Sequence, residues 1–570
     1  MPTDRSFCLK GTRRNSIAPP DTERKEWYPD MNYKKQQSCR VLTALLTILL
    51  CLSLLVSCAE APSGSDLGDG GAGGMHAGNS APNASPEYNK GDDASAPEGT
   101  DDTFRENDFL SVADKPVSTF SSDVDTASYA YFRKLVSGGM PFERIRDAYG
   151  ANIRTEEMLN YFSYRYTAPK EGEPFGVYTE IAPCPWNENN ALLMMNLTAE
   201  IAEPKEGGNN LVFLIDVSGS MYASDKLPLL KTAFTYLVER LTANDRVSIV
   251  TYSGKEAVVL EACKGDEKET ILAAINGLEA SGSTNGQAGL RMAYEIAESC
   301  KIENGNNRII MASDGDLNVG ISSAEELKNY IASKRDTGIY LSVLGFGTGN
   351  YKDAKMEALA DNGNGVYYYV DGESEAERIF GEGLFSTLYT VAKDVKLQVT
   401  FDPAYVDSYR LIGYENRILS EEDFEDDKKD AGDVGSGHTL TVCYELVLAS
   451  EEAESESKEP TIVPLVGKEP PQSDGSDHAW FTLEIRAKAP DSDTSVLYEY
   501  EFGAASYTDA PSYDFRFASA VIETAMLLHE SEYIGAVTLD DVIGALDAMS
   551  FTDDAKSEFV ALLKTARGAS

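Results

Sequence analysis

Residues 211–221 read LVFLIDVSGSM, an apolar run that leads straight into an Asp-x-Ser-x-Ser loop formed by Asp216, Ser218 and Ser220. Consecutive apolar residues of this kind are typical of a strand buried on both faces, as in a parallel sheet. Ligands of such sheets bind at the carboxyl ends of the strands. The stretch therefore predicts a strand that ends in one carboxylate and two hydroxyls, which are hard oxygen donors suited to a divalent cation.

The Asp-x-Ser-x-Ser pattern is a weak signal by itself, because it occurs by chance in many acidic proteins. Two later segments strengthen it. Thr284 lies in GSTN at 282–285, which opens a predicted helix, and Asp314 follows the apolar strand at 308–312. The carboxyl ends of parallel strands meet at one edge of the sheet. We therefore expect the three loops to converge on one metal site.

The predicted metal site is built from oxygen donors alone. Mg²⁺ requires near-octahedral oxygen ligands and keeps several waters, so we expect the hydroxyls of Ser218, Ser220 and Thr284 to bind it, with Asp216 and Asp314 largely behind them. Mn²⁺ and Ca²⁺ are alternative ions. Such a site leaves one position open, which an acidic residue of a protein partner completes. The competing interpretation is that these are ordinary capping and turn residues.

The metal ligands fall in a central domain at 209–393, where short apolar strands alternate with amphipathic helices. The expected strands cover 211–215, 246–252, 308–312, 339–344 and 366–370. Short apolar strands separated by helices indicate a mostly parallel, doubly wound α/β sheet of the Rossmann type.

Segments of globular composition flank the central domain. The N-terminal flank at 106–208 has predicted helices at 126–136 and 155–161 and strands at 176–181 and 192–197. After a helix expected to end near Lys393, the β-rich flank at 394–510 has predicted strands at 394–402, 439–448, 479–487 and 495–502.

The remaining C-terminal part, 511–570, is predicted to be helical. Its core-facing stripe consists of Ala518, Val521, Ile522, Ala525, Leu527 and Leu528. Two charge-rich runs in the β-rich flank, 421–430 and 450–477, are interpreted as solvated loops.

With these motifs in place, the chain resembles a known family. The five predicted ligands match the metal-ion-dependent adhesion motif of von Willebrand factor A domains. Further stretches look like the YfbK-type bacterial lipoproteins: STFSSDVDTASY at 118–129, APCPW at 182–186, DKLPLL at 225–230, GFGTG at 345–349 and RLIGYENR at 410–417. The resemblance covers roughly 107–570. It implies an A domain inserted between strands of a β-sandwich that the two flanks form, and it implies no particular binding partner.

Three smaller features invite a functional interpretation. Asp123 and Asp125 resemble a second cation loop, although an Asp before a helix is ordinarily an N-cap. Asp316 follows Asp314 closely, where it either tunes the site or is a solvated loop acid. The glycines Gly347 and Gly349 are interpreted as shaping a turn rather than as cradling phosphate.

The N-terminus reads as a targeting segment. Basic residues precede an apolar run at 41–56, and Leu55-Val56-Ser57-Cys58 has the form of a lipoprotein cleavage site. Residues 1–57 are therefore predicted to be a signal segment, with Met31 as a possible true start, and Cys58 to carry a lipid. Residues 58–105 are rich in small and polar residues, which predicts a flexible tether. We expect an extracytoplasmic protein held in the cell envelope by its lipid anchor alone.

The amino-acid composition argues against several kinds of partner and of active-site chemistry. A formal net charge of −43 disfavours nucleic acid and anionic lipid as direct partners. None of the four histidines lies in the central domain, which excludes histidine-based acid/base or zinc chemistry there. Beyond the signal segment and Cys58, the cysteines are Cys184, Cys263, Cys300 and Cys443. Their spacing indicates no metal site and no specific disulfide, and both free thiols and two bridges stay open.

The favoured function is a non-enzymatic binding module that docks an acidic residue of a protein partner onto the metal. An envelope assembly or scaffold factor is the second hypothesis. A metal-assisted hydrolase is the third, because Mg²⁺ also activates water. Against catalysis, the sequence has no Gly-x-Ser-x-Gly elbow, no His-Glu-x-x-His helix and no Walker loop. We therefore predict no catalytic residue.

Overall fold

The computed structural model describes residues 104–202, 207–283, 286–315, 324–347, 353–449, 478–490 and 492–568. The predicted signal segment 1–57, the lipidation site Cys58, the tether up to residue 103, the acidic run 450–477, Thr284, Asp316 and Gly349 lie outside these ranges. Within the ranges, none of the helices combines the length and the apolarity that a bilayer crossing requires.

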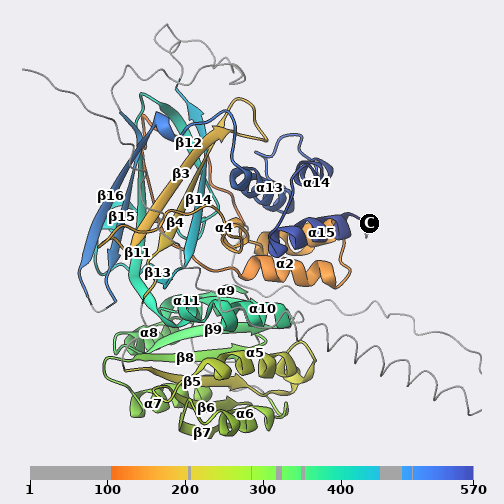
Figure 1. Cartoon of the computed structure of the whole chain (residues 1–570), viewed down its shortest axis with the longest axis vertical. Helices are drawn as coiled ribbons and strands as arrows, with labels where there is room; N and C mark the ends of the chain where they lie inside the picture. Colours follow the sequence, from red (N-terminus) through yellow and green to blue (C-terminus); the bar gives the residue numbers. More distant parts are fainter. Residues whose placement is uncertain are drawn as a thin grey trace, which may run out of the picture. The chain divides into compact units, whose positions relative to one another are not determined.

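The central domain is built on one six-stranded sheet. Its strands are β5 (Asn209–Asp216), β6 (Arg246–Tyr252), β7 (Glu256–Lys264), β8 (Asn306–Ser313), β9 (Tyr340–Phe346) and β10 (Tyr367–Val370). They lie in the order β10-β9-β8-β5-β6-β7, all parallel except β7 (Figure 1). The predicted α/β fold is confirmed. Strand β7 was missed: it is an antiparallel edge strand that follows β6 with no helix between them, and its apolar residues Val258 and Val259 are exposed rather than buried.

Helices cover both faces of this sheet. They are α5 (Leu227–Arg240), α6 (Lys268–Asn276), α7 (Gly286–Ser299), α8 (Ala324–Arg335), α9 (Asp353–Asn362), α10 (Glu373–Glu377) and α11 (Leu384–Leu388). Alternate side chains of β5 enter two different cores. Phe213 stacks on Phe234 of α5 at 4.3 Å between ring centroids, whereas Val212 packs in the core that holds Leu290 of α7. This two-sided burial explains the unbroken apolar run in the sequence of β5.

The two flanks together form a β-sandwich. The strands before the central domain are β1 (Leu110–Ser111), β2 (Val117–Ser121), β3 (Phe175–Pro183) and β4 (Ala191–Ala199). Those after it are β11 (Thr390–Phe401), β12 (Val406–Ile412), β13 (Gly432–Gly435), β14 (Thr439–Leu448), β15 (Ala479–Lys488) and β16 (Ser495–Gly503). One sheet has the order β1-β12-β14-β4-β3, and the other has β13-β11-β15-β16 with β2 also on β11.

Strand pairing crosses the central domain in both sheets. Thr198 of β4 is in register with Thr439 of β14, and Phe120 of β2 with Leu397 of β11. The expected insertion of the A domain between strands of a sandwich is therefore what the structure has. The two sequence ranges 106–208 and 394–510 share their sheets rather than folding separately.

The junction after the central domain differs from the prediction of a helix up to Lys393. Helix α11 ends at Leu388 and β11 begins at Thr390, because Val391 and Ala392 are buried in the apolar core. Asp394, which reads as the first residue of the strand, instead occupies a bulge with a φ of 50° inside β11. Part of the run 421–430 also differs from a loop, since it forms the short helix α12 (Glu421–Glu425), capped by Ser420.

The C-terminal segment is helical as predicted, with α13 (Tyr513–Leu528), α14 (Leu539–Asp547) and α15 (Asp554–Gly568). Helices α13 and α15 pack against helices of the N-terminal flank, and α14 packs on α13 and α15; the flank helices are α2 (Ala127–Ser137), α3 (Phe142–Tyr149) and α4 (Thr155–Asn160) (Figure 1). The ring of Phe162 lies 4.9 Å from that of Phe517 and 5.5 Å from that of Phe559. In the predicted stripe of α13, only Leu527 is partly exposed.

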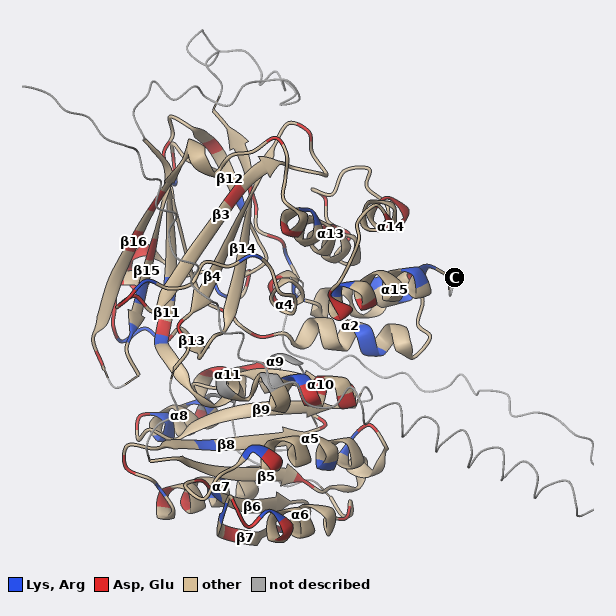
Figure 2. Ribbon diagram, viewed as in Figure 1, with Lys and Arg blue, Asp and Glu red and all other residues tan. Residues whose placement is uncertain are grey.

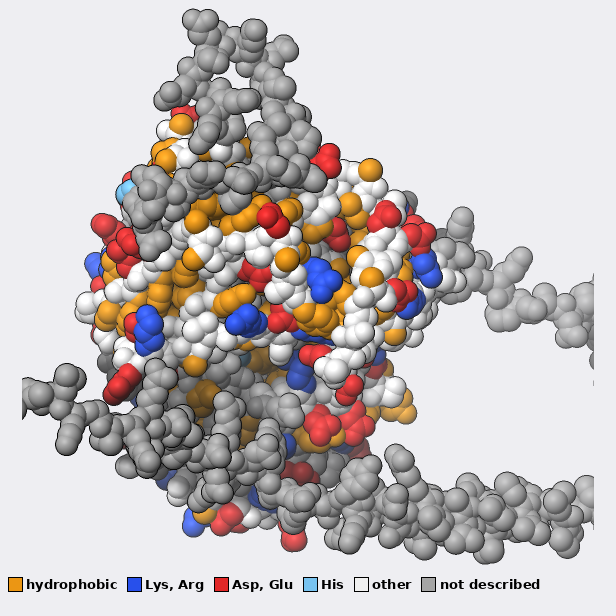
Figure 3. Space-filling view, turned by 45° about the horizontal axis from the view of Figure 1, so that its top comes forward, with side chains coloured by type: hydrophobic (Ala, Val, Ile, Leu, Met, Phe, Trp, Pro, Cys, Tyr) orange, Lys and Arg blue, Asp and Glu red, His pale blue; other side chains and the backbone are white. Residues whose placement is uncertain are grey.

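The cysteines in the described part of the chain are not paired with one another. Cys184, Cys263, Cys300 and Cys443 are buried free thiols. Acidic side chains occur on both the central domain and the sandwich (Figure 2). On the face seen in Figure 3, Lys and Arg side chains stand singly among acidic and apolar ones. That face offers no continuous basic surface for a polyanion.

Candidate metal centre

Strand β5 ends at Asp216, whose side chain is fully buried. One oxygen of Asp216, Oδ1, accepts a hydrogen bond from the backbone N–H of Ser218 at 2.8 Å. The turn places the hydroxyl of Ser218 3.0 Å from that of Ser220. Local sequence alone produces this arrangement, since an Asp side chain readily accepts from the N–H two residues ahead.

Strand β8, the parallel neighbour of β5, supplies the second carboxylate. It ends at Ser313, whose hydroxyl donates to Asp216 Oδ2 at 3.4 Å, and Asp314 follows directly, 3% exposed. Gly315 then takes a φ of 86°, a conformation that turns the chain away and favours glycine. Ser313 was not singled out from the sequence, although it lies in the quoted strand.

The third predicted loop, which contains Gly282, contacts the Asp-x-Ser-x-Ser loop through two backbone hydrogen bonds. The N–H of Gly219 donates to the carbonyl of Gly282 at 3.0 Å, and the N–H of Ser281 donates to that of Val217 at 2.7 Å. Thr284 lies just beyond the last described residue of this loop. The structure thus brings Asp216, Ser218, Ser220 and Asp314 together at one sheet edge, and the fifth predicted ligand is outside the described residues.

Burial and neighbouring charges shift the pKa values of two residues at the centre, Asp216 and Tyr252. Burial, with a smaller contribution from the charge of Asp314, raises the pKa of Asp216 to about 6, although hydrogen bonds from Ser218 lower it. Burial and the charge of Asp216 also raise the pKa of Tyr252, which is fully buried on β6. Two carboxylates held close together in a buried place are stabilised by a bound cation.

A lysine, Lys226, lies beside the centre, and it was not predicted from the sequence as part of the site. The Nζ atom of Lys226 lies 2.8 Å from Asp314 Oδ2. Lys226 precedes α5 and belongs to the stretch DKLPLL, which entered the sequence analysis only through the family resemblance. Its position ten residues after Asp216 gives no hint that it reaches a carboxylate on another strand.

The donor set of the centre fits a hard divalent cation. Two hydroxyls 3.0 Å apart lie beside buried carboxylates, which is the oxygen chemistry that Mg²⁺, Mn²⁺ and Ca²⁺ select. A bound ion would be held by Ser218 and Ser220, with Asp216 and Asp314 supplying negative charge. The ion would supply an electrophilic position that a ligand oxygen can fill.

The suspected second cation loop has a different role. Carboxylate oxygens of Asp123, Glu157 and Glu357 lie within 4.8 Å of one another, but arginines pair with them. Arg417 contacts Asp123 at 2.8 Å and Glu357 at 2.7 Å, and Arg154 contacts Glu157 at 2.7 Å. These ion pairs explain the cluster without a metal.

The expected N-cap by an Asp is also wrong. Helix α2 has Thr126 at its N-cap position, and no side-chain cap forms there. Instead, Glu157 Oε2 accepts from the backbone N–H of Ser128 at 2.7 Å. Asp125 is directed elsewhere, since its Oδ1 accepts from the N–H of Tyr367 on β10 at 3.1 Å.

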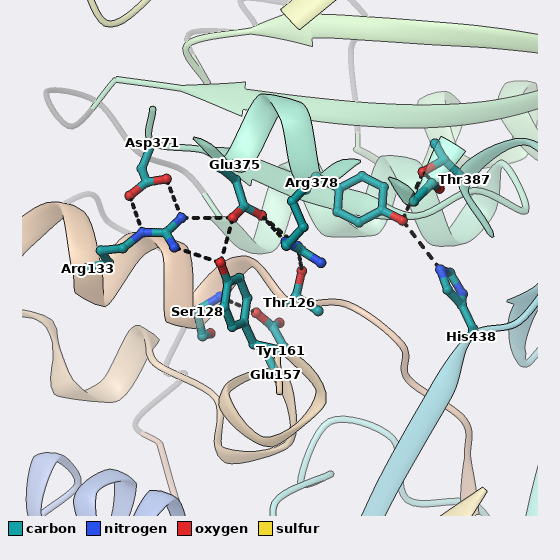
Figure 4. A network of polar contacts seen from close by, with 12 residues as sticks. Thr126, Ser128, Arg133, Glu157, Tyr161, Asp371, Glu375, Arg378, Thr387 and His438 are labelled. Atoms are coloured by element: carbon teal, nitrogen blue, oxygen red, sulfur yellow. Dashed lines mark hydrogen bonds and ion pairs between the residues drawn. The ribbon is translucent and has the colours of Figure 1, made fainter. Parts of the chain in front are cut away.

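A second polar network fixes α2 to the central domain (Figure 4). Arg133 of α2 pairs with Asp371 at 2.6 Å and with Glu375 of α10 at 2.8 Å, and Tyr161 donates to Glu375 at 3.0 Å. Burial alone would raise the pKa of Glu375, but the charges of Arg378 and Arg133 hold it below its usual range. Such charge-assisted contacts are strong and directional.

Comparisons with known proteins agree with this architecture. Family models match three segments: von Willebrand factor at 99–194, von Willebrand factor type A domain at 210–382, and uncharacterized protein YfbK, C-terminal, at 386–568. The chain is 38% identical over 475 residues to the uncharacterized protein YfbK of Escherichia coli (strain K12). That alignment covers 82% of this chain and 80% of the relative.

More distant relatives share less of the chain. Human inter-alpha-trypsin inhibitor heavy chain H3 is 29% identical over 177 residues, which cover 30% of this chain and 20% of the human protein. Among solved structures, the von Willebrand factor type A protein from Catenulispora acidiphila is 16% identical. It covers 71% of this chain and 91% of its own, with a TM-score of 0.39.

Proposed function

Since the chain belongs to the YfbK family of proteins with a von Willebrand factor type A domain, we propose that it binds a protein partner through a divalent cation. The single observation that carries this proposal is the cluster at the sheet edge. There, Ser218 and Ser220 present paired hydroxyls beside Asp216 and Asp314. The ion, for which Mg²⁺ is the first candidate, would accept an acidic side chain of the partner.

Binding rather than catalysis suits the groups at this centre. A hydrolase needs a group that takes a proton from the attacking water. The charged neighbour of Asp314 is Lys226, whose ammonium donates to that carboxylate at 2.8 Å. Of the described histidines, His438 and His478 lie in the β-rich flank and His529 lies in the C-terminal helical segment.

The surface beside the centre supports a protein partner. Tyr222 lies two residues after Ser220 and is 83% exposed, so its ring is available to a partner. Exposed tyrosines commonly become central contacts in protein interfaces. Tyr222 would therefore pack against the partner while the ion holds the partner's carboxylate.

Replacing Tyr222 by alanine tests this arrangement. We expect Tyr222→Ala to weaken partner capture about tenfold or more, the size typical of an aromatic contact at the centre of an interface, and to leave Mg²⁺ affinity unchanged. The measurement is chemical crosslinking on cells, with Mg²⁺ or with a chelator. Capture that survives chelation in the wild type would rule out a metal-mediated interface.

We also propose that the protein is an extracytoplasmic lipoprotein of the cell envelope, anchored through Cys58. The support is the apolar run at 41–56 followed by Leu55-Val56-Ser57-Cys58. Cells grown with a labelled fatty acid should incorporate the label into the wild type and not into Cys58→Ser. Equal labelling of the two proteins would refute the anchor.

A further inference from the structure

Lys226 brings a positive charge to the place where a cation is expected to bind. Its Nζ lies 2.8 Å from Asp314 Oδ2, and the two side chains are 13% and 1% exposed. An ammonium in such a dry position interacts with a neighbouring charge more strongly than it would in water. It therefore opposes a dication that approaches the same carboxylate.

The backbone just after β9 leaves room for the lysine stem. Gly347, which follows β9, has a φ of 76°, and a Cβ there would clash with Lys226 Cε and lie 3.0 Å from its Cγ. A side chain at this position would push the ammonium away from Asp314. The carbonyl of Gly347 accepts from the hydroxyl of Tyr369 at 3.1 Å, so the turn is itself held in place.

Helix α2 of the N-terminal flank contacts two residues that hold Lys226 in place. These are Asp225, which precedes Lys226, and Tyr369, which holds the Gly347 turn. Lys134 pairs with Asp225, the residue before Lys226, at 3.1 Å. Tyr131 packs its ring edge-on against Tyr369 at 5.5 Å between centroids. Arg133, which lies between them on α2, is bound to Asp371 and Glu375 (Figure 4).

We propose that Lys226 is a built-in counter-cation that sets the metal affinity of the centre, and that helix α2 positions it. This inference rests on the proposed function, because it concerns regulation of the same site. Lys226 weakens cation binding by competing for Asp314.

The test is calorimetric titration of Mg²⁺ into the full-length protein and three variants. Lys226→Met keeps the length of the side chain and removes its charge, so it should bind Mg²⁺ about tenfold more tightly, as expected for loss of a unit charge that faces a dication. Lys226→Arg keeps the charge and should stay within about threefold of the wild type. Lys134→Met, which breaks the pair with Asp225 and leaves Lys226 itself unsubstituted, should tighten binding by about two- to fivefold.

The outcomes separate this inference from the proposed function. If the wild type binds Mg²⁺ and Lys226→Met binds it equally or more weakly, the counter-cation is refuted while the metal site stands. If Lys226→Met binds more tightly but Lys134→Met equals the wild type, the role of α2 is refuted. If neither the wild type nor Lys226→Met binds Mg²⁺, the proposed function fails together with the inference. Thermal unfolding in a chelator, similar for all four proteins, shows that each variant is folded.

Discussion

Replacing Asp216 by alanine is expected to lower the Mg²⁺ affinity of the protein at least about 100-fold, so that binding heat disappears from a calorimetric titration. The variant loses both the buried negative charge and the carboxylate oxygen that shapes the Ser218 turn. Partner capture should disappear with the metal. In the wild type, Mg²⁺ should also raise the unfolding temperature, because a ligand that binds only the native state stabilises it.

A control variant distinguishes the loss of the metal site from the loss of any one acidic side chain of the domain. Glu256 is an exposed acid on β7 of the same domain, and Glu256→Ala should bind Mg²⁺ like the wild type. In a chelator, Asp216→Ala should stay folded, since burial already raises the pKa of Asp216 and its charge is unfavourable there without a cation. Unchanged Mg²⁺ binding in Asp216→Ala would show that the Asp-x-Ser-x-Ser turn is only structural.

Replacing Arg417 by methionine should destabilise the protein by about 3–5 kcal/mol, the range found when one partner of a buried ion pair is removed. Arg417 is 11% exposed and contacts Asp123, Glu357 and Asp361, each at 2.7–2.8 Å. Arg417 lies in the β-rich flank, Asp123 lies in the N-terminal flank, and Glu357 and Asp361 lie in α9 of the central domain. The variant leaves their carboxylates facing one another with Arg154 as the remaining arginine of the cluster.

The loss of stability in Arg417→Met should become smaller as the pH is lowered. Burial raises the pKa of Glu357 and Asp361 despite the neighbouring arginines, so the folded state holds their protons more tightly than the unfolded state does. Groups of this kind favour folding at low pH and lose that contribution as pH rises through their folded pKa. Without Arg417 these pKa values rise further, so the gap between variant and wild type should shrink as the pH is lowered.

Chemical denaturation followed by circular dichroism measures both effects. The control is Arg567→Met, because the pair of Arg567 with Asp540 is 48% and 74% exposed and should contribute less than about 1 kcal/mol. If Arg417→Met were as stable as Arg567→Met, the buried cluster would not hold the three segments together.

Local sequence information suffices for the strand and turn around Asp216. The strand that ends in Asp216 was predictable because two-sided burial demands a continuous apolar run, and the turn at Ser218 follows from short-range hydrogen bonding. The edge strand β7 has an apolar stretch at 257–260 that is largely exposed, so its existence depends on pairing with β6 rather than on burial of both faces. The same holds for the bulge at Asp394, where the strand continues through a residue that looks like a break.

By itself, the sequence determined the doubly wound central sheet, the convergence of Asp216, Ser218, Ser220 and Asp314, and the oxygen chemistry they share. Periodicity and strand ends are properties of neighbouring residues, and they can be read along the chain. The tertiary structure alone decided that Lys226 reaches Asp314, that Arg417 joins both flanks to the central domain, and that α2 supports the Lys226 loop. Long charged side chains choose their partners among groups that only folding brings close, and no spacing in the sequence encodes those distances.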